Sequence, residues 1–478
     1  MSRLLALAFP TGRLWGALSL VLLLGLMAAP AASAQDLGSR TDTTRVNFNE
    51  AVRIALDQNT NLKRAQATVQ QSESQLQAEW LDFTPSLNFS SNLQRQYGRN
   101  FSQVTGDFTS RSTDFFNMSA QSNLTLFNGF ENISSLRQAR SQSTADELNL
   151  QRTRREVVYT LMQQFIGLVE SREIVRVRRE ELSALRQQLR QVEEFVNAGS
   201  RPVSELYQQQ ANVAEAQQAL LQAQREREVA QTQIIQTLQL NPRQPYDFQV
   251  PALPDDSITT ESYNPSALID EAFQRRLDLR VAEADQDAAE HAVQSARSQY
   301  YPSLSVGGRY GTDWTSRPRP IPDPNNPNQT IQPGFSDQLD NNRGGGLSVS
   351  LSIPIFDQWQ RETQVQQAKV QAQNAQYALS DQQQEVALQV RQAYLDYRNA
   401  IQQLEAANAR LRAARQARTA AQERYNLGAA SIVELQNANR DFVDAASQQV
   451  RARYTLIFRE KQIEYFVGRL RPSEPLFE

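Results

Sequence analysis

Apolar residues recur every seven positions along one stretch of this chain. The repeat consists of Leu161, Leu168, Val175, Leu182, Leu189 and Val196. A strict seven-residue repeat keeps one stripe of a helix against a partner helix, as in a coiled coil. The stretch stops at Gly199 and Pro202, because glycine supplies a left-handed stop and proline suits the first turn of a new helix. A second apolar stripe follows through Leu206, Val213 and Leu220. We predict a long helix over residues 131–197, a sharp tip, and a return helix over residues 203–240.

The hydrophobic period changes before this long helix begins. A period of 3.6 predicts a helix over residues 47–81, and Pro85 ends it. Residues 85–97 and 115–127 then alternate between apolar and polar, which is typical of strands with one apolar face. The polar residues between them, 98–114, are expected to form a loop.

The same order of elements returns in the second half of the chain. We predict a helix over residues 265–299, strands over 302–314 and 345–356 around a loop at 317–342, a long helix over 359–427 and a return helix over 431–467. The pairs Phe127 and Phe356, Gly199 and Gly428, and Leu206 and Leu435 all share one offset in the numbering. A single offset that holds across so long a stretch indicates an internal duplication. Repeat 1 would span residues 47–240, a proline-containing connector 241–264, repeat 2 residues 265–470, and a tail 471–478.

The N-terminus has the pattern of a secretory signal peptide over residues 1–34. Arg3 and Arg13 precede an apolar core at residues 14–27, and the small residues Ala32-Ser33-Ala34 form a cleavage site. An uncleaved membrane anchor is the alternative, although the apolar core is short for a span. Residues 35–46 are expected to be a linker that precedes the first helix.

Composition excludes several classes of chemistry. The chain has no cysteine and a single histidine, His291, which argues against thiol chemistry, disulfides and most zinc sites. The net charge is −3 and charges of both signs are mixed, so nothing indicates nucleic-acid binding. His291 is expected to be an ordinary surface or interhelical residue. We expect no enzyme activity, cofactor or metal.

The four predicted strands suit a membrane better than a soluble core. Each has the length and the single apolar face of a lipid-facing strand, which needs about 9–11 residues. Aromatic residues lie near the strand ends farthest from the helices, namely Tyr97, Phe115, Phe116, Tyr310 and Trp314. Two soluble hairpins packed on each other are the alternative. Four strands cannot close a pore, and eight leave an interior filled by side chains, so three chains are the smallest assembly expected to leave a lumen.

These features together resemble the outer membrane efflux protein family, the TolC-like outer-membrane factors. The resemblance covers about residues 47–470 and rests on the duplicated architecture, on Pro-Ser-Leu at the start of one strand in each repeat, and on the two tips. It implies an α+β membrane protein of long α-helical hairpins, with four transmembrane strands per chain. It further implies a homotrimer with a twelve-stranded barrel in the outer membrane of a Gram-negative bacterium and a helical barrel in the periplasm. A belt around the helices would come from residues 241–265 and the C-terminal segment.

The resemblance also implies where partners bind. The tips would dock a periplasmic adaptor (membrane fusion) protein, which links to an inner-membrane pump of the RND, ABC or MFS type. The tip residues are Gly199, Ser200, Arg201, Pro202, Val203, Gly428, Ala429, Ala430, Ser431 and Ile432. Many family members close the periplasmic end with acidic residues before the second tip, but here only Glu423 is acidic in that stretch.

A different gate is therefore expected. Arg418 occupies the position that is Leu189 in repeat 1, and a charge on an apolar seam is costly unless it is paired or reaches water. We hypothesise that Arg415, Arg418 and Glu423 form the periplasmic constriction. In the alternative, the arginine stems lie along the seam and their charged ends lie in water.

The sequence thus predicts a passive exit duct across periplasm and outer membrane. Small-molecule or metal efflux and type I protein secretion share this architecture, so the transported substrate stays open. The alternative from another class is a secreted coiled-coil structural or adhesive protein without a pore.

Overall fold

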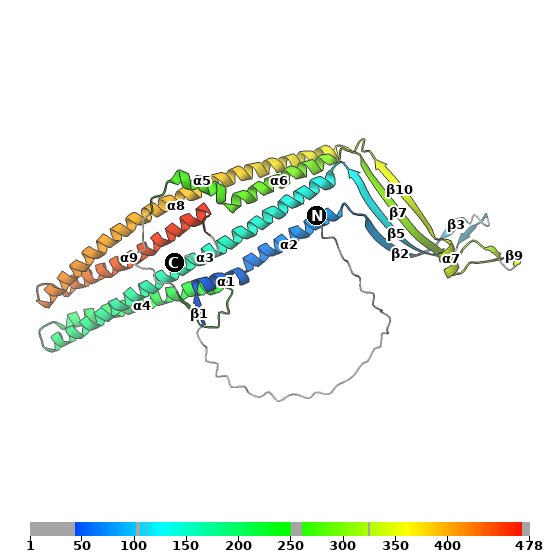
Figure 1. The fold of residues 1–478 in the computed structure, drawn as a ribbon. Coiled ribbons are helices and arrows are strands. Elements are labelled where there is room, and N and C mark those ends of the chain that lie inside the picture. Colours follow the sequence, from blue (N-terminus) through cyan, green and yellow to red (C-terminus); the bar gives the residue numbers. More distant parts are fainter. Residues whose placement is uncertain (1–43, 102–105, 111, 250–260, 324–325, 471–478) are drawn as a thin grey trace, which may run out of the picture. The chain divides into compact units, whose positions relative to one another are not determined.

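Four strands form one antiparallel sheet in the order β10-β7-β5-β2 (Figure 1). Their bounds are Ser86–Gln96 for β2, Thr113–Asn128 for β5, Ser303–Thr315 for β7 and Gly344–Ser352 for β10. The structure, a computed structural model, describes residues 44–101, 106–110, 112–249, 261–323 and 326–470. The predicted signal peptide (1–34), most of the linker and the tail (471–478) lie outside these residues.

Long helices continue from the strands in the same lateral order (Figure 1). α2 (Thr60–Leu81) leads into β2, α3 (Glu131–Asn197) follows β5, α6 (Leu277–Ser298) leads into β7, and α8 (Gln360–Asn426) follows β10. α3 packs against α2 and α6, and α6 packs against α8. Beyond them, α4 (Val203–Thr237) packs against α3, and α9 (Ile432–Val467) packs against both α3 and α8. The four-stranded sheet is thus extended by one layer of helices.

The two helices that carry the heptad seams, α3 and α8, each have 67 residues, or about 100 Å at 1.5 Å per residue. On α3 the first four members of the seam are buried, and Leu189 and Val196 are half-buried. Among the described residues, no helix combines the length and the apolar character needed to cross a membrane.

The sheet has one apolar and one polar face. Cross-strand pairing places on one face Leu87, Phe89, Leu93, Phe116, Met118, Leu124, Val306, Tyr310, Trp314, Leu347, Val349 and Leu351. Serine, asparagine, glutamine and glycine dominate the other face, together with Arg309 and Asp313. Every residue of β2 and β10 is exposed, so the described part of the chain puts no second layer over these strands. The alternative of two hairpins packed on each other is wrong.

The internal duplication extends to the ends of the helices. The offset from α3 to α8 is the same at both helix ends, and it equals the offset from the start of α4 to the start of α9. α5 (Pro265–Arg275) and α6 follow α1 (Phe48–Gln58) and α2 at a smaller offset, which is again the same at every helix end. The offset is larger for the helices that follow the strands than for the helices that precede them, because the loop between the strands is longer in repeat 2. It covers residues 97–112 in repeat 1 and 316–343 in repeat 2.

Each repeat also breaks its first helix, where the sequence pattern predicts a continuous one over 47–81 and 265–299. Asn59 separates α1 from α2 and Arg276 separates α5 from α6, both with extended backbone. Asn59 explains its own break, because its side chain accepts hydrogen bonds from Asn61 N and Leu62 N and caps α2. Arg276 is held by Asp278 and by the carbonyl of Phe466 at 3.3 Å, so tertiary contacts fix the second break.

Several segments expected to be irregular contain regular structure. The expected linker over 35–46 ends in β1 (Thr44–Asn47), which pairs in parallel with β6 (Tyr246–Gln249) of the expected connector. The two expected loops contain β3 (Arg99–Phe101) and β4 (Phe108–Ser110), and β8 (Ile321–Asp323), β9 (Asn326–Ile331) and α7 (Phe335–Asn341). These elements are only three to seven residues long. They are too short to show a recognisable alternation of apolar and polar residues.

Two predicted elements are shorter than expected. The return helix expected over 203–240 ends at Thr237, because Gln239 turns into the left-handed region with φ 56°. Gly468 takes the equivalent position after α9 with φ 84°. The strand expected over 345–356 ends at Ser352, before Pro354, which has no backbone N–H to donate to the ladder.

The largest apolar core lies where the duplicated halves meet β1 and β6. Phe48 of α1 packs edge-on against Phe165 of α3, and Phe165 packs against Phe248 of β6. All three side chains are buried. This core joins α1 to the middle of α3, to β6 and to α9.

Gly129 lies between β5 and α3, and its substitution tests how closely this turn packs against its neighbours. Its φ is +68°, and an added Cβ would lie 2.3 Å from the carbonyl oxygen of Ser298 and 2.7 Å from Cβ of Tyr301. Gly199 has a similar φ of +71° but open space around it. A left-handed non-glycine residue costs roughly 1–2 kcal/mol. We expect Gly199→Ala to lower the melting temperature slightly and Gly129→Ala to lower it much more, measured by circular dichroism of the purified protein. Equal losses would contradict the close packing at Gly129.

Candidate functional site at the helical tips

Both tips end their long helices with the same backbone geometry. Gly199 and Gly428 have φ values of 71° and 76°. Their N–H groups donate to the carbonyls of Val196 and Tyr425 at 2.9 and 3.0 Å. The next residue in each case donates to a carbonyl five positions back, at 2.9 and 2.8 Å. The predicted left-handed stops are therefore observed, and they satisfy carbonyls that a helix end otherwise leaves unpaired.

The two tips bind each other through Arg201, Glu205 and Tyr425. The guanidinium of Arg201 lies 4.7 Å from the centre of the Tyr425 ring and donates to the Tyr425 carbonyl at 3.2 Å. The Tyr425 hydroxyl donates to Glu205 Oε2 at 3.1 Å, and Arg201 pairs with Glu205 at 3.5 Å. Burial, followed by the charge of Glu205, raises the pKa of Tyr425 to about 12. The hydroxyl is therefore protonated and able to donate throughout the neutral range.

A small apolar core lies beneath this polar contact. Val192 of α3, Tyr425 of α8 and Leu435 of α9 are buried together, and Leu206 of α4 packs on them. Arg424 adds an ion pair with Glu434 and donates to the carbonyl of Ala429 at 3.2 Å, which ties the second tip to its own return helix. The tips thus form one packed unit within the chain.

Most of the predicted tip residues form exposed surface. Gly199, Ser200, Pro202, Val203, Gly428, Ala429 and Ser431 are exposed, and Arg201 is half-buried. Ala430 and Ile432 are buried, so their side chains support the tip from inside. Sequence reasoning missed the apolar neighbours Tyr207, Leu427 and Val433, which are 66%, 84% and 53% exposed. It also omitted Glu205 and Tyr425, whose contact joins residues 220 positions apart.

The three gate candidates occupy different environments. Arg415 and Glu423 are exposed on α8, whereas Arg418 is half-buried. The Arg418 guanidinium lies 3.8 Å from the centre of the Phe442 ring on α9. Burial, followed by the charge of Arg415, lowers the pKa of Arg418. Arg418 and Phe442 stand at the positions of Leu189 and Val213 in repeat 1, so repeat 2 has a cation over an aromatic ring where repeat 1 has two aliphatic residues.

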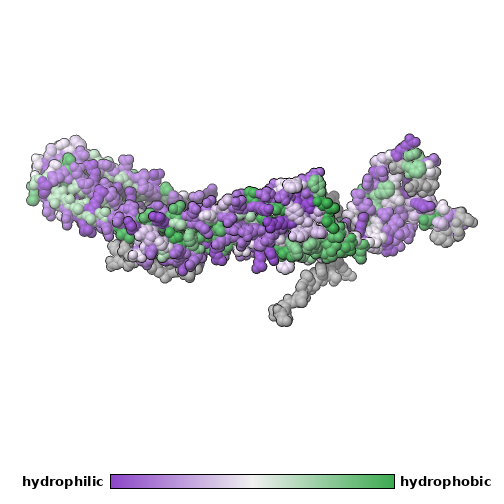
Figure 2. All heavy atoms as spheres, turned by 90° about the horizontal axis from the view of Figure 1, so that it is seen from above, coloured by the Kyte–Doolittle hydropathy of each residue, from purple (hydrophilic) through white to green (hydrophobic). Residues whose placement is uncertain are grey.

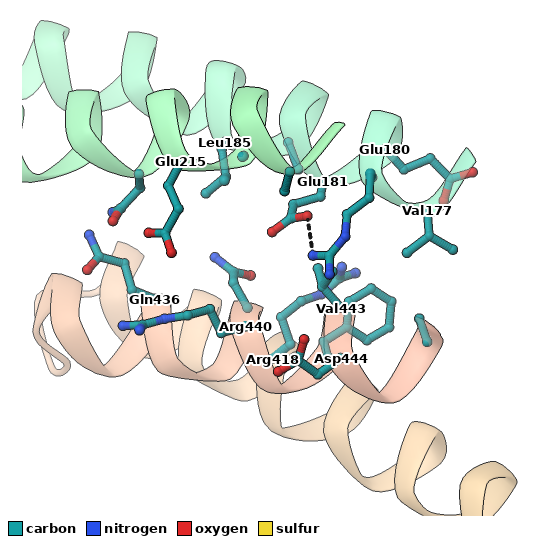
Figure 3. A pocket seen from close by; sticks show the side chains of 18 residues that line it. Val177, Glu180, Glu181, Leu185, Glu215, Arg418, Gln436, Arg440, Val443 and Asp444 are labelled. Carbon is teal, nitrogen blue, oxygen red and sulfur yellow. Dashed lines mark hydrogen bonds and ion pairs between the residues drawn. The ribbon is translucent and has the colours of Figure 1, made fainter. Parts of the chain in front are cut away.

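Arg418 also borders a cavity of about 460 Å³ between the two hairpins (Figure 3). α3 and α4 form one side with Glu181, Leu185 and Glu215, and α9 forms the other. Glu181 pairs with Arg178 at 3.0 Å. Gln436 also lines the cavity; it is only 5% exposed, and its side-chain Nε2 has no hydrogen-bond partner among the described residues. The hairpins therefore meet through a polar, incompletely packed interface rather than a continuous apolar seam.

Hydrophobic residues gather on the surface where the helices meet the sheet (Figure 2). Large exposed side chains there include Trp80, Phe83, Phe130, Tyr301, Phe356 and Trp359. At the far end of the sheet, Phe116, Trp314 and Phe335 form a second aromatic cluster with ring centres 5.4 to 5.8 Å apart. An apolar strand face between two aromatic belts is the surface pattern of a transmembrane strand.

Within the described ranges, no group of three or more histidine, cysteine, aspartate or glutamate side chains could hold a metal ion. The candidate sites are therefore surfaces and contacts: the paired tips, the interface near Arg418, and the two-faced sheet.

A single-layer sheet with one lipid-compatible face, joined to long helices, defines a membrane channel subunit of the TolC-like fold. The chain belongs to the outer membrane efflux protein family, whose model matches residues 51–238 and 268–469. It is located in the Gram-negative outer membrane and extends into the periplasm.

Individual relatives are distant in sequence and similar in fold. Outer membrane protein TolC of Salmonella enteritidis is 21% identical over 212 residues, which are 44% of this chain and 41% of that protein. The match therefore spans about two fifths of that relative's length. The CmeC outer membrane channel of Campylobacter jejuni is 19% identical with a TM-score of 0.75, over 90% of this chain and 87% of that one. CusC is 18% identical with a TM-score of 0.74, over 88% and 92%.

The contact between the tips can be measured by a double-mutant cycle. Arg201→Ala and Tyr425→Leu each remove one partner of the cation–π contact, whereas Tyr425→Phe keeps the ring and removes only the hydroxyl. We expect Arg201→Ala and Tyr425→Leu to couple by roughly 1 kcal/mol, because such contacts contribute about 0.5–2 kcal/mol. A cycle that combines Arg201→Ala with Tyr425→Phe should show much less coupling, because the ring that Arg201 contacts is still present. Local opening free energies from hydrogen exchange at residues 199 and 428 provide the measurement, and additive effects would refute the contact.

Proposed function

We propose that this chain is one third of a passive exit duct, the outer-membrane component of a tripartite efflux or type I secretion system. The observation that carries the proposal is the two-faced sheet: one face apolar and exposed, the other lined by serine, asparagine, glutamine and glycine. Lipid would contact the first face and water the second. The polar face continues into the layer of long helices, which supports a water-filled path through the periplasm.

The edges of the sheet support a trimer. Within the described residues, β2 and β10 each pair on one side only. Unpaired backbone groups cannot remain in lipid, so each edge must pair with the opposite edge of another chain. Three chains supply twelve strands and a lumen, whereas two would supply eight, which side chains fill. The edge helices α8 and α2, which continue β10 and β2, would meet in the same way in the periplasm, and α8 and α4 would meet nearer the tips.

The tips support docking of a periplasmic adaptor protein. Val203, Tyr207, Leu427 and Val433 expose apolar area beside Gly199 and Gly428. Because the tip contacts bury the supporting core inside the chain, this surface is preformed and available to a partner. The adaptor would connect the duct to an inner-membrane pump of the RND, ABC or MFS type, which drives transport.

Arg415, Arg418 and Glu423 remain our proposed periplasmic gate, now with distinct roles. The exposed Arg415 and Glu423 would line the constriction. Arg418, stacked on Phe442, would hold α8 against α9 beside the cavity between the two hairpins, so that the second hairpin would move as one unit. The incompletely packed cavity beside Arg418 supports this role, because few apolar contacts oppose a displacement there.

The duct and its gate can be tested in planar lipid bilayers. The purified protein should require detergent, form a heat-resistant oligomer and give discrete ion currents. Leu347→Lys puts a charge on the apolar face and should prevent insertion, since such a residue costs about 2–4 kcal/mol at the bilayer midplane. Its neighbour Ser348→Lys, on the polar face, should still insert and change ion selectivity. A monodisperse water-soluble protein without currents would instead favour the coiled-coil structural or adhesive alternative.

The same recordings test the gate. Arg418→Leu should raise conductance or change ion selectivity, whereas Arg398→Leu, an exposed arginine on the same helix farther from the tip, should do neither. Currents identical to those of the unmodified protein would exclude Arg418 from the gate without affecting the duct proposal.

Adaptor docking can be tested at Val203. Val203→Asp should abolish cross-linking to the adaptor in cells and the transport that depends on it, because it charges the centre of the apolar tip surface. Val229→Asp is the matched control, since Val229 lies on the same helix with 46% exposure against 49% for Val203. Both variants must still form the trimer. Equal loss in both would argue against a docking surface at the tip.

A further inference from the structure

The apolar face of the sheet ends at a defined level. Leu93, Phe116 and Trp314 are direct cross-strand partners and form its last apolar row. One step farther along the same face, Arg95 pairs with Asp114 through two hydrogen bonds, from Nε to Oδ1 at 2.5 Å and from Nη2 to Oδ2 at 2.8 Å. Aromatic residues followed at once by an ion pair mark the level at which hydrocarbon gives way to the polar interface.

α7 lies on this face, at this level. Phe335, its first residue, contacts the rings of Phe116 and Trp314 at 5.8 and 5.4 Å. Thr312, which shares the apolar face, is buried, and its hydroxyl donates to the carbonyl of Leu339 at 2.7 Å. The helix therefore does not extend freely from the end of the sheet. It folds back over the side that, under the proposed function, contacts lipid.

Hydrogen bonds between the side chains of Gln338 and Asn342 and nearby backbone groups hold α7 in place. The Gln338 side chain is 4% exposed; its Oε1 accepts from Thr315 N at 3.0 Å, and its Nε2 donates to Thr315 O at 3.2 Å and Pro333 O at 3.0 Å. Asn342 donates to the carbonyl of Asp313 at 2.8 Å. One side chain thus pairs with both backbone groups of the last residue of β7, as a neighbouring strand would.

The exposed side chains of α7 are divided by polarity. Phe335 is 51% exposed beside the aromatic row. Asp337 and Asp340 are also exposed, and Asp340 pairs with Arg343 at 2.7 Å. The helix also lies in the loop that is longer in repeat 2 than in repeat 1.

We propose that α7 is an interfacial helix that sits among the headgroups of the outer leaflet, with Phe335 inserted at the boundary of the hydrocarbon. This rests on the proposed function, because it requires the apolar face to contact lipid. Lipid is the occupant that fits, since the helix continues an apolar surface already exposed to the membrane. A neighbouring chain does not fit as well, because it would pair along the outer edges of β2 and β10, whereas Phe335 of α7 lies against Phe116 of β5 and Trp314 of β7.

The chain has no cysteine, so single cysteines can be labelled without background. Phe335→Cys, Asp340→Cys and Leu347→Cys would each carry an environment-sensitive fluorophore in the full-length oligomer, reconstituted in phospholipid vesicles. Nitroxides placed either at the headgroup or deep in the acyl chain would quench the fluorescence. We expect loss of fluorescence at residue 335 mainly with the headgroup nitroxide and at residue 347 mainly with the deep one. At residue 340, on the exposed side of α7, the headgroup nitroxide should quench less than at residue 335, and the deep one should not quench.

The outcomes separate this inference from the function on which it rests. Quenching at residue 347 without quenching at residue 335 would overturn the interfacial helix and leave the duct intact. No quenching at residue 347 would overturn both. As a second measurement, Gln338→Ala should release the helix from Thr315, so that the label at residue 335 loses its headgroup quenching while the label at residue 347 keeps its deep quenching. Unchanged quenching at residue 335 in Gln338→Ala would show that the bonds to Thr315 do not position the helix.

Discussion

Backbone hydrogen bonding in lipid is the constraint on which the rest of this structure depends. Among the residues that the structure describes, the four-stranded sheet leaves two edges, β2 and β10, with unpaired N–H and C=O groups. The side chains add a second constraint, because the described residues leave the apolar face of β2 and β10 exposed. Under the proposed function, association of several chains would pair the edges, and lipid would cover the apolar face. The lateral order of the helices repeats the order of the strands. Under the proposed function, the assembly that closes the sheet would also bring the edge helices together in the periplasm.

Duplication supplies a nearly symmetric subunit, and function is expected where the symmetry fails. The ends of the long helices, the left-handed residues and the tips of the two repeats correspond at one offset. The departures are local: Arg418 and Phe442 replace Leu189 and Val213, and the longer loop of repeat 2 adds α7. One departure lies near the periplasmic end and the other at the outer rim of the sheet. At Arg418 a cation–π contact stands where repeat 1 has two aliphatic residues, and α7 adds the contacts of Phe335 with Phe116 and Trp314.

The tips illustrate how stability and binding share residues. Arg201, Glu205 and Tyr425 join residues from two hairpins, and the core beneath them is buried within the chain. The apolar side chains left outside, such as Leu427, have no partner in this core. A packed support under an exposed apolar rim is an arrangement suited to recognition, because the surface loses little conformational entropy on binding.

The sequence by itself determined the periodic elements. Heptads located α3 and α8, alternation located the four strands, and glycine placed both tips, because these signals depend only on neighbours within a few residues. Tertiary structure alone decided the break at Arg276, the pairing of β1 with β6, the contact of Arg201 with Tyr425, and the fold of α7 onto β7. Each of these is set by contacts between distant segments. Local periodicity contains no information about such contacts, and therefore the sequence identified the repeated elements but not how distant segments pack on one another.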